Sequence, residues 1–318
     1  MSATHPMRSA VLIMGPTAAG KTDLALRLAD RWPIDIISVD SAMVYRGMNI
    51  GTGKPSPAVL QRYPHRLVDI LDPAQPYSAG QFTRDARAAI EAAHQAGKLP
   101  VLVGGTMLYF RALRRGLAEL PSADPATREQ IDHEAAERGW PALHGELAAI
   151  DPKAAARIRP NDAQRIQRAL EVFRLTGKTL SELHAAHPGP DPGMRFFAYA
   201  WVPGERAKLY DAIEARLHRM MREGFLEEVE TLYRREDLHA DLPSIRSVGY
   251  RQLWEHLQGK VALESAVQRA IFATRQLARR QLIWLRSEDE VHWIDALESS
   301  AEAQMVQAIG SVLNERRT

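Results

Sequence analysis

The chain of 318 residues carries 41 Lys and Arg against 39 Asp and Glu, and its formal charge of +2 gives it no general affinity for polyanions. With 45% hydrophobic and 25% charged residues, its composition is that of a globular protein of one large or two smaller domains. It has no cysteine, which excludes disulfides and thiolate metal sites, and no apolar run approaches membrane-spanning length, so we expect a cytoplasmic protein without a membrane partner.

The first predicted strand, at residues 10–14, leads into the glycine-rich turn Gly15-Pro-Thr-Ala-Ala-Gly-Lys-Thr22. This turn matches the phosphate-loop pattern G-x-x-x-x-G-K-[ST] at every required position, and helical spacing follows at residues 23–30. Small residues let backbone N–H groups wrap an anion, and the helix N-terminus adds positive potential. Lys21 supplies a mobile charge, and the hydroxyl of Thr22 can ligate Mg²⁺. The alternative, a tight strand-to-helix turn without a ligand, does not need the Lys-Thr pair.

Two more strands are predicted in the first third of the chain. One, at residues 34–39, ends at Asp40; a helix is predicted at 81–96, and the next strand, at 100–103, runs through two glycines into Thr106. Alternating strands and helices predict a parallel sheet covered on both faces. Ligands of such sheets bind beyond the carboxyl ends of the strands. We therefore expect the glycine turn, Asp40 and Thr106 to line one crevice.

The carboxylate of Asp40 would face a diphosphate across that crevice and could accept a proton from an attacking nucleophile. A turn cap and an outer ligand of magnesium are its alternative roles. Many phosphate-loop NTPases carry, after the third strand, an aspartate that holds the metal and helps to activate water. This chain has Thr106 in that region, which disfavours an ATPase and suits an enzyme with diphosphate as a leaving group. A simple polar turn is the alternative for Thr106.

From residue 122 to residue 184 the sequence carries only helix signals. Asp124-Pro125 is an N-cap with proline in the first helical position. Asn161 to Gln164 form a variant capping box, and Gly177 ends the helix that this box opens. The turn residues of 187–193 then interrupt regular structure.

The chain returns to the sheet with a strand predicted at 196–202, followed by helices and a last short strand near 291–294. We predict an α/β fold: a P-loop NTPase-like parallel sheet flanked by helices, with an all-helical insertion domain. The catalytic core comprises residues 1–115 and 194–318, and the insertion comprises residues 116–193. We expect a monomer.

Three stretches rich in Arg and Gln lie in the helical parts of the chain, at 164–168, at 246–251 and between Glu264 and Glu288. In the last stretch the helical spacing places three arginines on one side, namely Arg275, Arg279 and Arg286. A basic face is often only a solvated face. Arg and Gln also contact phosphates and read base edges, so three such patches beside a phosphate crevice favour RNA binding.

Further segments accompany these motifs in a fixed order. They are Gly15–Thr22, Asp40-Ser41, Tyr45–Met48 with Ile50–Thr52, Gly104–Tyr109, Asn161–Ala169, Ser247–Arg251, and Arg280-Gln281 with Trp284. Over nearly the whole chain, this set resembles the tRNA dimethylallyltransferases (isopentenyl transferases). The resemblance implies transfer of a dimethylallyl group from dimethylallyl diphosphate to the exocyclic N6 amine of the adenosine at position 37, next to the tRNA anticodon, with release of diphosphate.

The resemblance also implies roles for individual residues. Asp40, Thr106 and Lys21 would be catalytic: Asp40 would be the base on the adenine amine, and Thr106 would position the reacting groups. The implied diphosphate ligands, with Mg²⁺ at Thr22, are Gly15, Pro16, Thr17, Ala18, Ala19, Gly20, Lys21, Thr22 and Arg216. The implied contacts of the tRNA anticodon stem-loop are Asp40, Ser41, Ala42, Met43, Thr106, Arg128, Gln164, Arg165, Ile166, Gln167, Arg168, Arg246, Ser247, Val248, Gly249, Tyr250, Arg251, Arg279, Arg280, Gln281, Trp284 and Arg286.

Two positions depart from the family pattern, and two other functions stay open. Many members carry Gln at the place of Met43 and Thr at the place of Ile283, so the polar side-chain contacts with RNA that the resemblance implies at these two positions are not expected here. A phosphate-loop small-molecule kinase is one alternative, because the turn alone does not distinguish ATP from another diphosphate. The arginine patches and the missing nucleotide lid argue against it. A non-catalytic, nucleotide-sensing RNA-binding protein is the other alternative.

Overall fold

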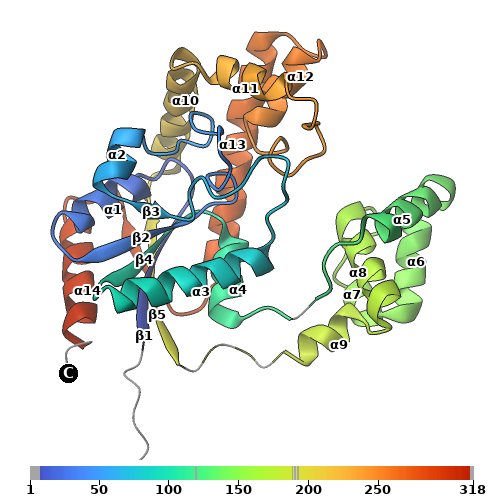
Figure 1. Ribbon diagram of the computed structural model, residues 1–318, viewed down its shortest axis with the longest axis horizontal. Coiled ribbons are helices and arrows are strands. Elements are labelled where there is room, and N and C mark those ends of the chain that lie inside the picture. The colour runs from blue at the N-terminus through green and yellow to red at the C-terminus, as the bar shows by residue number, and fades with distance from the viewer. Residues whose placement is uncertain (1–7, 119, 188, 190, 192, 316–318) are drawn as a thin grey trace, which may run out of the picture. The chain divides into compact units, whose positions relative to one another are not determined.

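The computed structural model describes residues 8–118, 120–187, 189, 191 and 193–315. Contacts between residues divide the chain into two compact units, Met1–Arg114 with Asp191–Thr318, and Arg115–Pro190 (Figure 1). None of the helices in the described ranges combines the length and the apolar character that a membrane span requires.

A six-stranded sheet forms the centre of the larger unit, with the strand order β3-β2-β4-β1-β5-β6 (Figure 1). Every neighbouring pair is parallel, which confirms the predicted α/β fold with a parallel sheet. The strands are β1 (Arg8–Met14), β2 (Ile34–Val39), β3 (His65–Arg66), β4 (Leu99–Gly104), β5 (Met194–Val202) and β6 (Val291–Asp295). Strands β2 and β4 are buried along their whole length, as near-continuous apolar runs require in a sheet covered on both faces.

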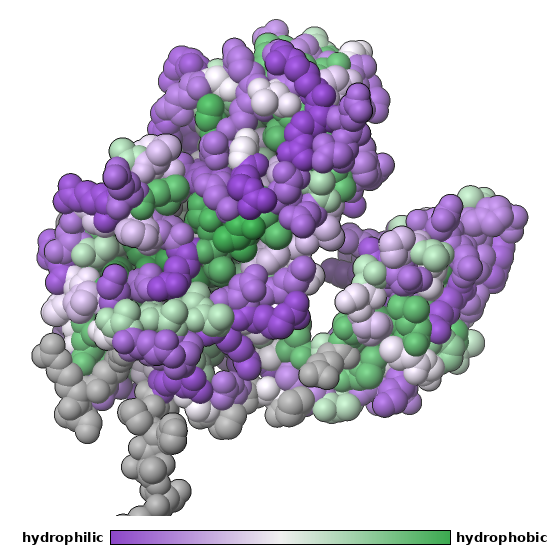
Figure 2. All heavy atoms as spheres, in the orientation of Figure 1, coloured by the Kyte–Doolittle hydropathy of each residue, from purple (hydrophilic) through white to green (hydrophobic). Residues whose placement is uncertain are grey.

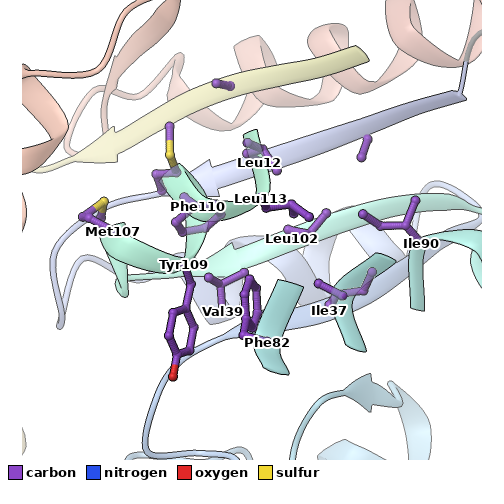
Figure 3. Packing of buried hydrophobic residues seen from close by; sticks show 14 of the residues in the cluster. Leu12, Ile37, Val39, Phe82, Ile90, Leu102, Met107, Tyr109, Phe110 and Leu113 are labelled. Atoms are coloured by element: carbon purple, nitrogen blue, oxygen red, sulfur yellow. The ribbon is translucent and has the colours of Figure 1, made fainter. Parts of the chain in front are cut away.

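Some helices of the larger unit cover the two faces of this sheet, and others form a separate layer. They are α1 (Lys21–Ala29), α2 (Pro57–Arg62), α3 (Ala79–Gln95), α4 (Met107–Arg115), α10 (Arg206–Arg222), α11 (Phe225–Tyr233), α12 (Tyr250–Leu257), α13 (Leu263–Arg286) and α14 (Ala301–Glu315). On one face, Phe82 of α3 and Phe110 of α4 pack against Leu12 and Leu102 (Figure 3). The ring of Phe82 is stacked on that of Tyr109, with centroids 4.4 Å apart.

The opposite face of the sheet is covered by α1 and α14. Leu24 of α1 and Met305 of α14 pack there against Val11 and Ile13 of β1. Because side chains alternate along a strand, β1 supplies Leu12 to one core and its two neighbours to the other. This burial on both faces fixes the position of the turn that follows β1.

A third core joins the four helices α10 to α13 to the loop that follows β2. Phe225 and Tyr250 are buried in it together with Val44, Tyr45 and Met48 of the loop. The loop after β2 is therefore held between the sheet and a layer of helices.

The smaller unit contains helices α5 (Pro125–Arg138), α6 (Trp140–Ile150), α7 (Pro152–Ala155), α8 (Ala163–Thr176) and α9 (Leu180–Ala185). Its core includes Ile131, Leu143 and Ile166. Asp124 caps α5 by accepting a hydrogen bond from Thr127 N at 2.8 Å, as the sequence predicts.

The predicted capping box of α8 is wrong by one residue. The cap is Asp162 rather than Asn161, because the helix begins at Ala163 and the carboxylate of Asp162 accepts from Arg165 N. Gly177 ends this helix with a left-handed φ of 68°, as predicted.

Candidate active site

The glycine turn joins β1 to α1 and packs against the end of β5. A Cβ at Gly15 would lie 2.2 Å from the carbonyl oxygen of Trp201, so only glycine fits there. The indole Nε1 of Trp201 donates a hydrogen bond to the carbonyl oxygen of Ala19 at 2.9 Å. Ala18 and Gly20 have left-handed φ angles of 64° and 78°. The first of these is unusual for a residue with a Cβ, so the turn stores strain that its surroundings hold in place.

Lys21 is the first residue of α1, and its side chain is buried. Its Nζ donates a hydrogen bond to the carbonyl oxygen of Pro16 at 2.6 Å. The pKa of Lys21 is lowered to about 7 by burial and, to a smaller extent, by the charge of Arg216, while the charge of Asp40 opposes the shift. Near neutral pH this lysine is consequently able to take up a proton when an anion enters the turn.

Asp40 follows β2 and has two differently placed carboxylate oxygens. Its Oδ1 accepts hydrogen bonds from Ala42 N at 2.8 Å and from Met43 N at 3.2 Å. The turn-capping role that the sequence left open is therefore real. Within the described residues, Oδ2 has no hydrogen-bond partner, and Asp40 lines two cavities. One oxygen thus fixes the side chain while the other stays free for chemistry.

Thr106 follows β4 and ties the end of that strand to the end of β2. Its Oγ1 accepts a hydrogen bond from Ser41 N at 3.2 Å, and its backbone N–H donates to Val39 at 3.2 Å. Gly104 permits this closeness, since a Cβ there would lie 2.0 Å from the carbonyl oxygen of Val39. The two strand ends that were expected to converge do so.

Arg216, on α10, enters the same region from the helical layer. Its Nη2 donates to the carbonyl oxygen of Thr52 at 3.1 Å, and a Cβ at Gly53 would lie 1.8 Å from that nitrogen. Burial lowers the pKa of Arg216, and Asp40 acts in the opposite direction. A guanidinium stays protonated at neutral pH in spite of such a shift.

Glu228 of α11 supports a loop of the site, a role that the sequence did not predict. Its carboxylate accepts hydrogen bonds from the backbone N–H groups of Asn49 and Ile50 at 2.8 Å each and of Gly51 at 3.1 Å. The hydroxyl of Tyr250 donates to it as well, at 2.6 Å. This carboxylate holds residues 49–51 of the loop, and the next residue, Thr52, accepts the hydrogen bond from Arg216. No local pattern could have revealed it, because its backbone partners lie 177 to 179 residues away along the chain.

Two cavities, of about 510 and 850 Å³, meet at these residues. The larger one contains the glycine turn from Thr17 to Thr22, and the smaller one contains Thr106 and Arg280. Residues that line both cavities are Thr17, Ala18, Asp40, Thr52, Gly105, Arg216, Met220 and Gln281. In Figure 2 hydrophobic side chains are visible in the middle of the larger unit, between hydrophilic surfaces. Because Asp40 and Arg216 line both cavities, they lie where the two cavities join.

Most residues of the larger unit that the sequence assigns to tRNA lie around the smaller cavity. Besides Asp40 and Thr106, those that line it are Ser41, Ala42, Arg246, Ser247, Val248, Gly249, Tyr250, Arg280, Gln281 and Trp284. Met43 lines the larger cavity instead. Arg279 and Arg286 are exposed on α13, and in the part of the chain that the structure describes no ion pair engages either of them. Arg251 is exposed on α12 and pairs with Glu255 at 3.2 Å.

Three side chains of the sequence-predicted RNA surface, those of Arg275, Tyr250 and Trp284, make contacts within the protein. Arg275 pairs with Glu214 at 2.6 Å, so one of the three arginines predicted on one side of this helix is engaged within the protein. Glu214 belongs to α10, and the helical spacing of α13 could not show that α10 packs against it. Tyr250 is 1% exposed, and the ring of Trp284 is covered by the guanidinium of Arg111 at 4.4 Å.

In the smaller unit, Glu171 is fully buried and engages two of the arginines assigned to tRNA. It pairs with Arg128 at 2.8 Å and with Arg168 at 2.5 Å, and the two cations hold its pKa below the usual range although burial opposes them. Gln167 donates to Asp132 at 2.7 Å. Gln164 and Arg165 are exposed, whereas Ile166 is 0% exposed. The side chain of Ile166 belongs to the core and cannot touch RNA.

The fold and the site define a P-loop NTPase-like α/β protein whose glycine turn faces a second, cationic cavity. Models of two families match the chain: IPP transferase over residues 43–288 and isopentenyl transferase over residues 8–72. The chain is 54% identical over 301 residues to a tRNA dimethylallyltransferase of Thioalkalivibrio sulfidiphilus, covering 94% of each chain.

Solved structures agree with this. One is the full-length tRNA isopentenylpyrophosphate transferase of Bacillus halodurans, with 36% identity, a TM-score of 0.71 and 98% of each chain covered. A eukaryotic dimethylallyltransferase acting on tRNA shares the fold, with 24% identity, a TM-score of 0.80, and coverage of 96% of this chain and 79% of the other. The chain belongs to the IPP transferase family, the tRNA dimethylallyltransferases, enzymes that prenylate adenosine 37 of tRNA.

Proposed function

We propose that this enzyme transfers the dimethylallyl group of dimethylallyl diphosphate to N6 of adenosine 37, with the donor in the larger cavity and the base in the smaller one. The observation that carries the proposal is the position of Asp40, which lines both cavities and keeps one carboxylate oxygen free of hydrogen bonds within the described residues. A base placed there can accept a proton from an amine that enters from the smaller cavity, while the reacting carbon of the donor arrives from the larger cavity.

The diphosphate is bound by the glycine turn and by two cations. Backbone N–H groups of the turn and the N-terminus of α1 favour an anion. Lys21 and Arg216 line the same cavity as the turn, so both can neutralise the charge that develops on the leaving oxygen. A charged diphosphate also offsets the burial that lowers the pKa of Lys21.

Magnesium fits this cavity as a companion of the diphosphate. Within the described residues no cluster of three or more His, Asp or Glu could hold a metal ion by itself. Thr22 and Asp23 both line the larger cavity. Mg²⁺ typically takes one or two protein oxygens, substrate phosphate oxygens and water, so the hydroxyl of Thr22 suffices as a direct ligand. The ion would supply charge neutralisation on the diphosphate.

The transfer joins N6 of adenine to C1 of the dimethylallyl group as the bond from C1 to the diphosphate oxygen breaks. The electron pair of that bond leaves with the diphosphate, and the amine proton passes to the free oxygen of Asp40. The amine is a poor nucleophile because its lone pair is delocalised into the ring. Proton removal during bond formation contributes about 10²–10⁴-fold in rate. Thr106, hydrogen-bonded to Ser41 N, positions the reacting groups.

The tRNA contacts are the cationic side chains around the smaller cavity and those of the helical unit. Arg246 and Arg280 line the cavity, and Arg279 and Arg286 are exposed beside it on α13. In the smaller unit, Gln164 and Arg165 are exposed, and Arg128 keeps 40% of its side chain exposed. Such contacts offset the cost of a few kcal/mol for taking the target base out of its stack.

One assay separates this function from its two alternatives. The protein is incubated with labelled dimethylallyl diphosphate, Mg²⁺ and unmodified tRNA, and the RNA is then analysed for label. The proposal predicts label in the RNA. Phosphorylation of a metabolite by ATP without label in the RNA would favour the kinase. Tight tRNA binding without any covalent product would favour a non-catalytic RNA-binding protein.

A further inference from the structure

Gln281 of α13 connects two loops of the active site through its side-chain amide. Its Oε1 accepts a hydrogen bond from the backbone N–H of Thr17 at 2.9 Å. Its Nε2 donates to the carbonyl oxygen of Gly105 at 2.8 Å. The residue is only 9% exposed, and its partners lie 264 and 176 residues away along the chain. Both hydrogen-bonding groups of this amide are thus engaged inside the protein.

Packing around the amide is tight on the side of Gly105. A Cβ added at Gly105 would lie 2.4 Å from Nε2 of Gln281. Glycine at this position is therefore what allows the amide to reach the loop that leads to Thr106. On its other side, the amide holds Thr17, which directly precedes the strained Ala18 with its φ of 64°.

Strain of this kind persists only where neighbouring contacts enforce it. The hydrogen bond from Thr17 N to Gln281 is such a contact, since it fixes the Pro16–Thr17 peptide group, one residue before Ala18. It also occupies the N–H of Thr17, so a diphosphate has to be held by the other N–H groups of the turn. The glycine turn and the loop of Gly105 are both parts of the site, and α13 also carries the exposed Arg279.

We propose, on the basis of the function proposed above, that Gln281 is a positioning residue of the diphosphate site and not a contact of the tRNA. Its amide fixes the separation between the glycine turn and Gly105, and it ties both loops to the helix that presents the free arginines. A core side chain without hydrogen bonds would fill the space but would leave Thr17 N and Gly105 O unsatisfied.

The test replaces Gln281 by Met, which has a similar volume and forms neither hydrogen bond. The dissociation constant of Mg²⁺–pyrophosphate and the KM for dimethylallyl diphosphate should each rise about tenfold, because the hydrogen bond to the turn and the one to Gly105 are both lost. The kcat should change less than about threefold, and the dissociation constant of tRNA less than about twofold. Gln276→Met is the matched control, because Gln276 is half-buried on the same helix and has no hydrogen-bond partner within the described residues.

Gly105→Ala tests the same link from the other loop and serves if Gln281→Met does not fold. The new methyl group displaces the end of the flexible Gln281 side chain, so weaker pyrophosphate binding is expected here too. Weaker tRNA binding with unchanged pyrophosphate binding in Gln281→Met would make Gln281 an RNA contact and overturn the inference. Unchanged pyrophosphate binding in both variants would also overturn it. The unsubstituted enzyme, assayed for label in tRNA, tests the proposed function separately.

Discussion

Asp40 at the end of β2 and Arg216 on α10 both line each of the two cavities, and the charge of Asp40 raises the pKa of Arg216 against the effect of burial. The two residues come from separate parts of the fold. Asp40 is fixed by the loop that follows β2, and Arg216 by the carbonyl oxygen of Thr52. A base and a cation that recognises diphosphate are thereby held where donor and acceptor would meet.

Replacing Asp40 by Asn should reduce kcat by about 10²–10⁴-fold, because the proton acceptor is lost. The amide oxygen of Asn can still accept from Ala42 N and Met43 N, so the turn keeps its cap. The dissociation constant of tRNA, measured by filter binding, should change less than about twofold. Single-turnover transfer that proceeds at the unsubstituted rate would remove Asp40 from the role of base.

Binding of dimethylallyl diphosphate should be accompanied by proton uptake at pH 8. The pKa of Lys21 is lowered to about 7 in the free protein, and a bound diphosphate raises it. Between the two pKa values the complex holds one proton more than the free protein, so affinity falls as the pH rises above 7. Calorimetry in buffers of different ionisation enthalpy measures this uptake. Lys21→Met provides the comparison, and equal proton uptake in both proteins would contradict the assignment.

Glu228→Gln should loosen the loop that places Thr52 against Arg216. The carboxylate accepts hydrogen bonds from three backbone N–H groups, and the amide replaces one of its acceptor oxygens by a donor. We expect the free energy of unfolding to fall by about 1–3 kcal/mol and the KM for the donor to rise. Tyr250→Phe, which removes a single hydrogen bond to the same carboxylate, should cost about 1 kcal/mol in urea denaturation. A larger loss of unfolding free energy in Tyr250→Phe than in Glu228→Gln would show that the hydroxyl of Tyr250 stabilises the protein more than the contacts with the loop do.

Replacing Arg279 and Arg286 together by Ala should reduce the slope of log K against log salt for tRNA binding by about one to two units. Both side chains are exposed, and no ion pair engages them within the described residues. Arg275→Ala is the control, because Arg275 is already paired with Glu214 at 2.6 Å. Its substitution should leave the slope nearly unchanged. An equally large reduction of the slope in Arg275→Ala would contradict this prediction, because a paired arginine would then contribute to tRNA binding as much as the two unpaired ones.

The sequence predicted those parts of the fold that depend on local pattern. Buried parallel strands appear as short apolar runs, and the strand expected at residues 34–39 coincides with β2. Since parallel strands end at one edge of the sheet, the sequence alone predicts Asp40 and Thr106 near the glycine turn. By contrast, β3 has only two residues, His65 and Arg66, and carries no such pattern.

Contacts between distant segments were beyond the reach of sequence patterns. Helical spacing placed Arg275 beside Arg279 but could not show that α10 presents Glu214 to it. The amide of Gln281 and the carboxylate of Glu228 acquire their partners only when loops from different strands meet the helical layer. Such side chains have no motif of their own, because their function depends on backbone groups more than a hundred residues away.

Transfer of the dimethylallyl group to N6 of adenosine 37 is tested most directly by mapping the product of a reaction with labelled dimethylallyl diphosphate, Mg²⁺ and unmodified tRNA. The tRNA is digested to nucleosides, and released diphosphate is measured in parallel. One diphosphate should be released per transferred group, and all of the label should be on N6 of adenosine 37. Diphosphate release without label in the RNA, or label on any other nucleoside, would contradict the proposed transfer.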